Sequence, residues 1–231
     1  MKFQPGDIIS HTQMCLAENL SLQRGMNFKV RGSTSIILMS TRKGAPYEDK
    51  LESGGQTLIY EGHDVPRTKN LKGSPKFIDQ PMETAYGKLT ENGKFFKAAQ
   101  EYKSSGTVEL VKVYEKIKDG IWVYNGVFQL IDAWVEQASK RNVFKFKLRI
   151  TEKDVTATKF ADDLVHNRMI PSHVKVEVWK RDKGQCVECG SKNNLHFDHI
   201  LPFSKGGTSL RAENIQLLCA RHNLQKHDKL I

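Results

Sequence analysis

The chain reads CVEC at residues 186–189 and CARH at residues 219–222, and these two stretches decide the fold of its C-terminal part. In each, two metal-ligating side chains are separated by two residues, a spacing at which a tight turn directs both toward one ion. Four such ligands complete the tetrahedron that Zn²⁺ prefers and leave no open position, so the pattern predicts a structural zinc site. A segment under about 60 residues needs such a site because it cannot bury enough core. The predicted ligands are Cys186, Cys189, Cys219 and His222.

A second group of polar residues lies between the two zinc half-sites and just after them. The sequence reads HFDHILP at 196–202, SKGG at 204–207, ENIQLLC at 213–219 and RHNLQK at 221–226. It places an Asp-His pair at the end of an extended run, then a Gly-Gly loop, then one asparagine on each side of the second half-site. Hydrolysis of a phosphodiester needs a base for water and a cation on the developing charge, and these residue types can supply both.

Throughout residues 176–231 this arrangement resembles the HNH (ββα-metal) nuclease family, through its DHI-x-P, GG, EN-x-x-x-LC and N-x-x-K elements. The resemblance implies that His199 is the general base and that Asn214 supports the loop and orients this histidine. It also implies that Asp198 and Asn223 hold one Mg²⁺ or Mn²⁺, since such ions take few protein oxygens beside water and phosphate. Adjacent residues of a strand point to opposite faces, and the resemblance implies a distorted strand end that turns Asp198 toward the metal.

The sequence departs from the commonest pattern of the family at two positions. His222 stands where a fourth cysteine is usual, and Asn223 stands where the third motif residue is usually histidine. Both residues keep the ligand chemistry, so an active nuclease is still expected. Lys226, one turn further along the same helix, is expected to contact the DNA backbone.

The N-terminal residues 1–150 consist largely of β-branched and aromatic runs separated by Gly, Asn and Asp, which predicts many strands. The runs are GSTSIILMS, QTLIYEG, TVELVKVYEKI, GIWVYNGVFQLIDAWVE and RNVFKFKLRI. The last run alternates, with Lys145, Lys147 and Arg149 opposite the apolar face, so we expect a basic outer face that contacts the DNA backbone. One helix is expected over residues 90–103. This composition predicts an α+β fold with a curved sheet or open barrel.

Part of this N-terminal region carries a more specific signature. Residues 44–62 read GAPYEDKLESGGQTLIYEG, and they are followed by LTENG at 89–93, VKVY at 111–114 and YNGVFQL at 124–130. These elements resemble those of SRA (SET- and RING-associated) domains over most of residues 5–150. The resemblance implies a crescent-shaped β-barrel with flanking helices that flips a modified cytosine out of the duplex.

The residues of the base pocket are carried over from this resemblance one by one. Tyr47 and Tyr60 match the two stacking tyrosines of the family, and Asp49 is expected to read the edge of the base, with Glu48 as the alternative. The family's Thr falls at Glu61 here. The expected base is therefore 5-methylcytosine or a hydroxymethylated or glucosylated relative.

The charge of the chain indicates its partner. The net charge is +10 and the pI is about 9.4, which predicts a polyanion such as double-stranded DNA, whose phosphates Lys and Arg neutralise. No run approaches the about 20 apolar residues that span a bilayer, and the N-terminus lacks the apolar core of a secretory signal. A cytoplasmic protein without membrane contact is therefore expected.

The polar stretch 151–172 ends in Ile-Pro-Ser, and the composition changes sharply after it. We therefore expect an SRA-like domain at 1–152, a linker at 153–172 and an HNH domain at 173–231. Ser172 is expected to cap the helix that opens the last of these.

Together these patterns predict a modification-dependent DNA endonuclease of a restriction system, in which an SRA-like reader is fused to an HNH cutter. Two alternatives remain open. The first is an HNH endonuclease that reads unmodified sequence through an unrelated β domain, and the second is a zinc-stabilised DNA-binding protein without cleavage activity. Because one HNH centre cuts one strand at a time, double-strand cleavage predicts a homodimer.

Overall fold

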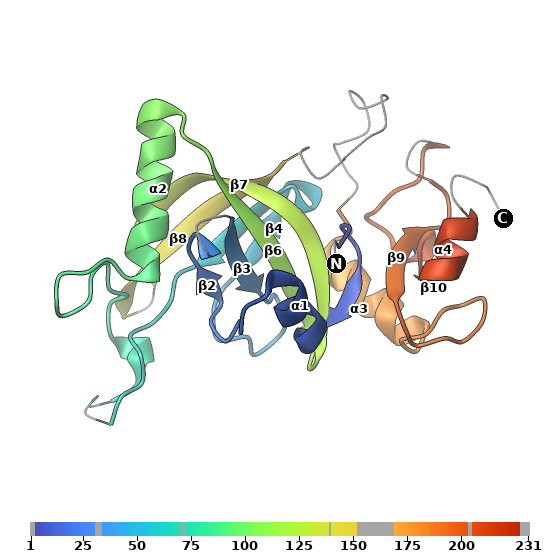
Figure 1. Ribbon diagram of the computed structural model, residues 1–231, viewed down its shortest axis with the longest axis horizontal. Coiled ribbons are helices and arrows are strands. Elements are labelled where there is room, and N and C mark those ends of the chain that lie inside the picture. Colours follow the sequence, from blue (N-terminus) through green and yellow to red (C-terminus); the bar gives the residue numbers. More distant parts are fainter. Residues whose placement is uncertain are drawn as a thin grey trace.

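The computed structural model describes residues 3–30, 34–69, 71, 73–138, 140–151, 169–202 and 205–226. They form a β-rich part and a smaller C-terminal lobe, which lie at opposite ends of the long axis (Figure 1). The mixture of helices and strands confirms the predicted α+β class. Residues 153–168 of the predicted linker lie outside the described residues. Among the helices of the described ranges, none has the length and apolar character that a membrane crossing requires.

The β-rich part is built on one eight-stranded sheet. Its strands follow the order β2-β3-β6-β7-β8-β5-β4, and β1 pairs with β7. β3 and β6 run parallel, while the other neighbours run antiparallel. Register shifts in the pairing of β7 with β6 and with β8 bend the sheet into the arch of Figure 1. The bounds are β1 (Ile8–Ser10), β2 (Met26–Asn27), β3 (Ser35–Met39), β4 (Lys50–Glu52), β5 (Thr57–Glu61), β6 (Glu109–Lys118), β7 (Ile121–Ala138) and β8 (Arg141–Ile150).

Two helices flank this sheet. α1 (His11–Glu18) directly follows β1, and α2 (Glu91–Ser105) lies at the far end of the molecule from the C-terminal lobe (Figure 1). The Thr90 hydroxyl accepts a hydrogen bond from the backbone N–H of Gly93 at 3.2 Å and so caps α2. Its buried inner face, with Phe95 at 0% exposure, packs into the core of the sheet. The helix predicted in this region is confirmed.

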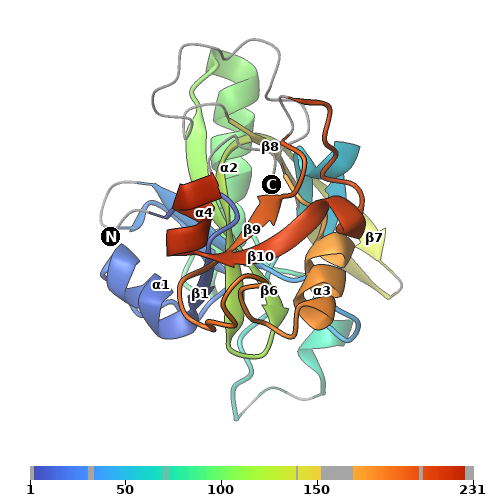
Figure 2. The ribbon, with the colours of Figure 1, turned by 90° about the vertical axis from the view of Figure 1, so that its right-hand side faces the viewer.

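The C-terminal lobe contains a two-stranded antiparallel sheet and two helices, and Figure 2 views them from their outer side. The start of its first helix differs from the prediction. Ser172 is the first residue of the helix, and Pro171, with an extended backbone, takes the N-cap position in its place. The elements are α3 (Ser172–Arg181), β9 (Leu195–His199), β10 (Ile215–Cys219) and α4 (Ala220–Lys226).

The lobe and the β-rich part share one apolar core. Ile117 of β6 and Val123 of β7 pack in the same buried cluster as Val174, Leu195 and Leu217 of the lobe. A hydrogen bond of 2.6 Å also joins the two parts, between the Asp7 carboxylate and the His196 ring. The two parts are therefore packed against each other.

A buried ion pair crosses the same boundary. The Lys175 ammonium of α3 donates to Glu115 Oε2 at 2.8 Å and to Asn125 Oδ1 at 2.7 Å, and each of the three residues is 1% exposed. Burial by itself would raise the pKa of Glu115, but Lys175 outweighs this effect and lowers it. Because a buried charge without its partner is strongly destabilising, this network fixes α3 on the sheet.

Candidate active site and nucleic-acid interface

The four predicted zinc ligands come together. Their ligand atoms all lie within 4.8 Å of one another. Cys186 and Cys189 lie in the turns between α3 and β9, Cys219 ends β10, and His222 lies in the first turn of α4. The sulfurs of Cys189 and Cys219 are 3.9 Å apart, close to the about 3.8 Å that a tetrahedron with Zn–S bonds of about 2.3 Å requires. The donor set therefore fits a structural Zn²⁺.

The Cys186 thiol is adapted to this role. Burial opposes its ionisation, but hydrogen bonds, first from the backbone of Cys219 and then from His222, outweigh burial and lower the pKa of Cys186 to about 6. Its sulfur lies 3.3 Å from Nδ1 of His222. Thiolates are the form that binds zinc, so the surroundings favour the metal-binding state.

The Asp-His pair ends β9, as the sequence predicts. The Nε2 atom of His199 lies 2.8 Å from the hydroxyl of Ser209, which is fully buried. A partner on one ring nitrogen fixes the orientation and the tautomer of a histidine. Ser209 is thus a residue of the site that the motif does not reveal, because a serine just after a Gly-Gly loop is an ordinary loop residue.

The carboxylate of Asp198 points toward α4. Its Oδ2 atom accepts hydrogen bonds from the Lys226 ammonium and, at 3.4 Å, from the Gln216 amide. The same ammonium also donates to the backbone carbonyl of His199. Lys226 therefore holds the end of β9 at both residues of the pair.

The position of Lys226 differs from the prediction. An exposed contact with the DNA backbone was expected, but the residue is 3% exposed and its ammonium is turned inward. The reason is the ion pair with Asp198, which lies far away in sequence and compensates the burial of the charge. Asn223 lies three residues earlier on α4 and therefore on the same helix face as Lys226.

Asn214 closes the loop that follows β9. Its side chain accepts from the backbone N–H of Leu201 at 2.8 Å and donates to the carbonyls of Leu201 at 3.1 Å and Thr208 at 3.0 Å. Gly207 passes so close that a Cβ there would lie 1.9 Å from the Leu201 carbonyl oxygen. Gly207 is thus needed for this close packing, whereas Gly206 has open space around it but a φ of +87°. Asn214 supports the loop, as the resemblance implies.

A divalent cation also fits this site by donor chemistry. Asp198 offers a carboxylate and Asn223 an amide oxygen, which are the hard ligands that Mg²⁺ and Mn²⁺ prefer. Both residues belong to elements that pack on each other, β9 and α4. A cation bound by Asp198 would compete with the ammonium of Lys226 for the carboxylate.

Tyr47 lies in the loop between β3 and β4, residues 40–49, and acidic side chains hold this loop in place. Asp49 accepts from the backbone N–H of Ser40 at 3.0 Å and of Glu61 at 3.1 Å, and the Glu61 carboxylate accepts from the backbone N–H of Glu48 at 3.1 Å. Burial raises the pKa of Asp49 to about 7, although both backbone hydrogen bonds oppose the shift. The loop is therefore fixed to the end of β5, with the side chain of Glu48 exposed.

Both predicted pocket tyrosines contact the same histidine, which sequence reasoning missed. The ring of His63 stacks on Tyr47 with a centroid distance of 5.5 Å and an interplanar angle of 21°. Its Nε2 atom lies 3.2 Å from the hydroxyl of Tyr60. Tyr47 is half-buried, whereas Tyr60 is only 1% exposed, and the Lys76 ammonium lies 4.0 Å from the ring centroid of Tyr47.

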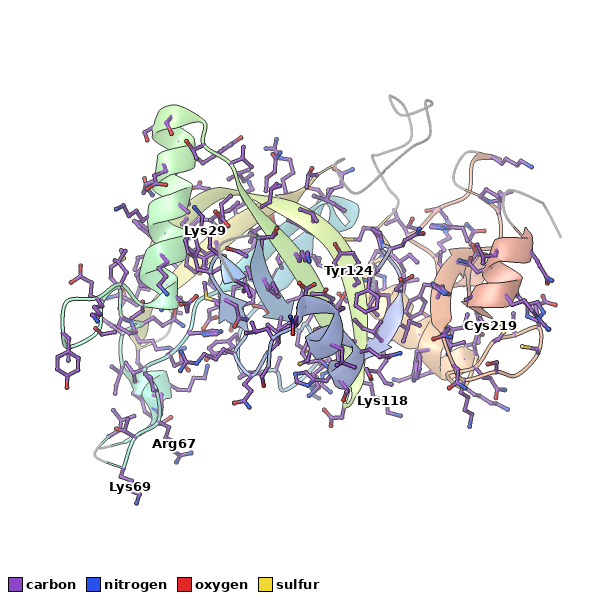
Figure 3. All side chains as sticks on the ribbon, in the orientation of Figure 1. Lys29, Arg67, Lys69, Lys118, Tyr124 and Cys219 are labelled. Carbon is purple, nitrogen blue, oxygen red and sulfur yellow. The ribbon has the colours of Figure 1, made fainter. Side chains whose placement is uncertain are left out.

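The predicted basic face of β8 is only partly present. Arg149 is exposed and Lys147 is half-buried, but Lys145 is 3% exposed and donates to Glu61 at 3.1 Å. The prediction of an outward-facing Lys145 is therefore wrong. It is buried because the antiparallel register places it directly opposite Glu61 of β5, so that the two charges neutralise each other. Other basic residues, Arg67 and Lys69, project from the outer end of a loop (Figure 3).

Several solved structures resemble the chain at low sequence identity. The SUVH5 SRA domain in complex with hemimethylated CG DNA is 23% identical and has a TM-score of 0.43, with 66% of this chain and 86% of that chain covered. The same domain bound to fully hydroxymethylated CG DNA is 24% identical and has a TM-score of 0.44, with 66% and 87% covered. SUVH6 of Arabidopsis thaliana is 20% identical and has a TM-score of 0.42, with 65% and 26% covered.

A comparison with curated proteins found no match. A family model does match the C-terminal lobe. It is the model of the HNH endonucleases, and it covers residues 186–229, from the first zinc ligand to beyond α4. This match confirms the predicted HNH nuclease segment.

Proposed function

We propose that the protein is a modification-dependent DNA endonuclease, in which the β-rich part binds a flipped, modified cytosine and the C-terminal lobe hydrolyses the phosphodiester bond. One observation carries the proposal. The HNH segment that carries Asp198 and His199 shares an apolar core with the β-rich part, in which the rings of Tyr47 and Tyr60 both contact His63. A basic chain with both features suits a DNA substrate.

The cleavage step follows from the surroundings of the Asp-His pair. His199 takes a proton from water, the resulting hydroxide attacks phosphorus in line, and the bond from phosphorus to the leaving oxygen breaks. In the tautomer whose Nε2–H donates to Ser209, Nδ1 carries the lone pair that a general base needs. Mg²⁺ or Mn²⁺ held by Asp198 and Asn223 would supply positive charge beside the phosphate. Asn214 keeps the following loop in place.

The reading step uses the aromatic rings around His63. A base taken out of the duplex must be compensated by stacking and by hydrogen bonds to its edge. Tyr47 and Tyr60 supply the rings. Each carboxylate oxygen of Asp49 accepts one backbone hydrogen bond and has a second lone pair for an amine of the base. The exposed Glu48 is the alternative. We propose 5-methylcytosine or a hydroxymethylated relative as the base, and Lys147 and Arg149 as contacts to the DNA backbone.

The test is digestion of one duplex sequence with and without cytosine modification. We expect cleavage of the modified duplex in Mg²⁺ or Mn²⁺, none in EDTA, and little of the unmodified duplex. Cleavage that is equal on both duplexes would favour a reader of unmodified sequence. Binding without cleavage in either metal would favour a zinc-stabilised DNA-binding protein.

Tyr47→Ala is the matched variant for this test. Loss of a stacking ring costs about 1–3 kcal/mol per base, so the variant should lose its preference for modified DNA. Its weaker, salt-sensitive binding to any duplex should remain, because phosphate contacts do not depend on the base. Tyr86→Ala is the control, since this tyrosine is 91% exposed and lies outside the ring contacts of Tyr47, Tyr60 and His63.

Double-strand cleavage by one HNH centre per chain calls for two chains, and we propose a homodimer on the duplex. Light scattering of the protein with the modified duplex should give the mass of two chains per duplex. The mass of one chain, both alone and on DNA, would instead support nicking or sequential cuts.

A further inference from the structure

We propose that the imidazole of His63 occupies the base-binding place between Tyr47 and Tyr60 when no DNA is bound, and that a flipped base enters only when this ring turns aside. The inference rests on the proposed function, because it concerns the same pocket. It makes His63 a residue that determines which bases are admitted and how tightly they bind.

His63 contacts both tyrosines, with ring centroids 5.5 Å from Tyr47 and 6.4 Å from Tyr60. It stacks on the first at an interplanar angle of 21° and is hydrogen-bonded to the hydroxyl of the second at 3.2 Å. A base stacked on Tyr47 and reaching Tyr60 would need the place that this imidazole takes.

A flat ring between two others needs about 3.5 Å on each side, or about 7 Å between the flanking planes. Tyr47 and His63 are too close together to admit a base between them. The side of Gly25 is closed as well, because a Cβ on Gly25 would lie 2.5 Å from the Tyr60 hydroxyl and 2.8 Å from Nε2 of His63. A base that stacks on this face of Tyr47 must therefore take the place of the imidazole, and the imidazole must turn away from Gly25.

The side chain of His63 can turn while its backbone stays in place. Asn92 of α2 binds both backbone groups of His63, accepting from its N–H at 2.8 Å and donating to its carbonyl at 2.8 Å. The ring itself is held by the stack on Tyr47 and the hydrogen bond to Tyr60. Burial also lowers the pKa of His63 to about 4, so the ring leaves as a neutral group. When a base displaces the imidazole, the stacking contact with Tyr47 and the hydrogen bond to Tyr60 are lost, and this loss reduces the affinity for the base.

Binding of three duplexes to two variants of His63 tests the inference. All proteins carry His199→Ala so that cleavage is too slow to disturb the binding measurement. The duplexes hold 5-methylcytosine, unmodified cytosine or an abasic site at one position. His63→Ala removes the ring and should bind the 5-methylcytosine duplex about tenfold more tightly than its parent. His63→Phe keeps a ring in the pocket and should bind more like the parent than like the alanine variant. Binding to the abasic duplex should not change, because no base enters.

The outcomes separate this inference from the proposed function. If the parent does not distinguish the cytosine forms, the proposed reader and this inference fail together. If the parent prefers 5-methylcytosine and His63→Ala binds it equally or more weakly, only the inference fails, since His63 then supports the base or the fold.

A second measurement on the parent does not depend on how the alanine variant folds. The ring signal of His63 in ¹³C-histidine-labelled protein, assigned by its loss in His63→Phe, should shift with the 5-methylcytosine duplex and not with the abasic one. An equal shift with both duplexes would overturn the inference.

Discussion

Replacing His199 with alanine is expected to lower the rate of DNA cleavage by about 10²–10⁴-fold, the usual loss when a general base is removed. The imidazole lies at the end of β9 on the hydroxyl of Ser209 and takes no part in the zinc cluster. Zinc content, melting temperature and affinity for modified DNA should therefore stay near those of the parent. Initial rates on a labelled duplex, with metal analysis of the same preparation, measure both quantities.

His173→Ala is the control for this variant, because His173 is exposed on α3 in the same lobe. It should cut at the parental rate. Cleavage by His199→Ala at the parental rate would remove His199 from the mechanism. A folded His199→Ala that no longer binds DNA would assign it to substrate binding instead.

Replacing Cys186 with serine is expected to release zinc and to unfold the C-terminal lobe. A structural zinc site contributes about 10–16 kcal/mol in small domains, which is more than a lobe of this size can replace with apolar burial. Cys186 is also 1% exposed within the core that the lobe shares with β6 and β7. We therefore expect the β-rich part to melt at a lower temperature as well.

The measurements are zinc per chain by elemental analysis and thermal melting followed by circular dichroism. Cys15→Ser is the matched control, since Cys15 lies in α1 and outside the metal cluster, and it should keep both zinc and melting temperature. A parent preparation without zinc, or a Cys186→Ser variant that melts with the parent, would disprove the assignment of the site.

The sequence predicts best what depends on residues close together in the chain. The zinc ligands come in two pairs of fixed spacing, and the helix expected over residues 90–103 follows local rules, so both were predicted. The Asp-His pair and its supporting Asn214 lie in one motif of fewer than twenty residues, and the structure places them at one loop.

What could not be predicted depends on partners that lie far away in the sequence. The pattern of β8 gives Lys145 and Lys147 the same outward face, and only the strand register places Glu61 opposite the first of them. Lys226 is buried for a similar reason, because Asp198 lies 28 residues before it. His63 shows no motif at all, since its role follows from contacts with two rings that no periodicity links.

The buried contact between Lys175 and Glu115 bears on how such a protein can evolve. Two domains on a loose tether can be exchanged by recombination, because each keeps its own surface. Here a swap of the C-terminal lobe would leave Glu115 charged, buried and without its ammonium, a loss of about 3–5 kcal/mol when one partner of a buried pair is removed. A new combination of β-rich part and C-terminal lobe would have to inherit both sides of this boundary together.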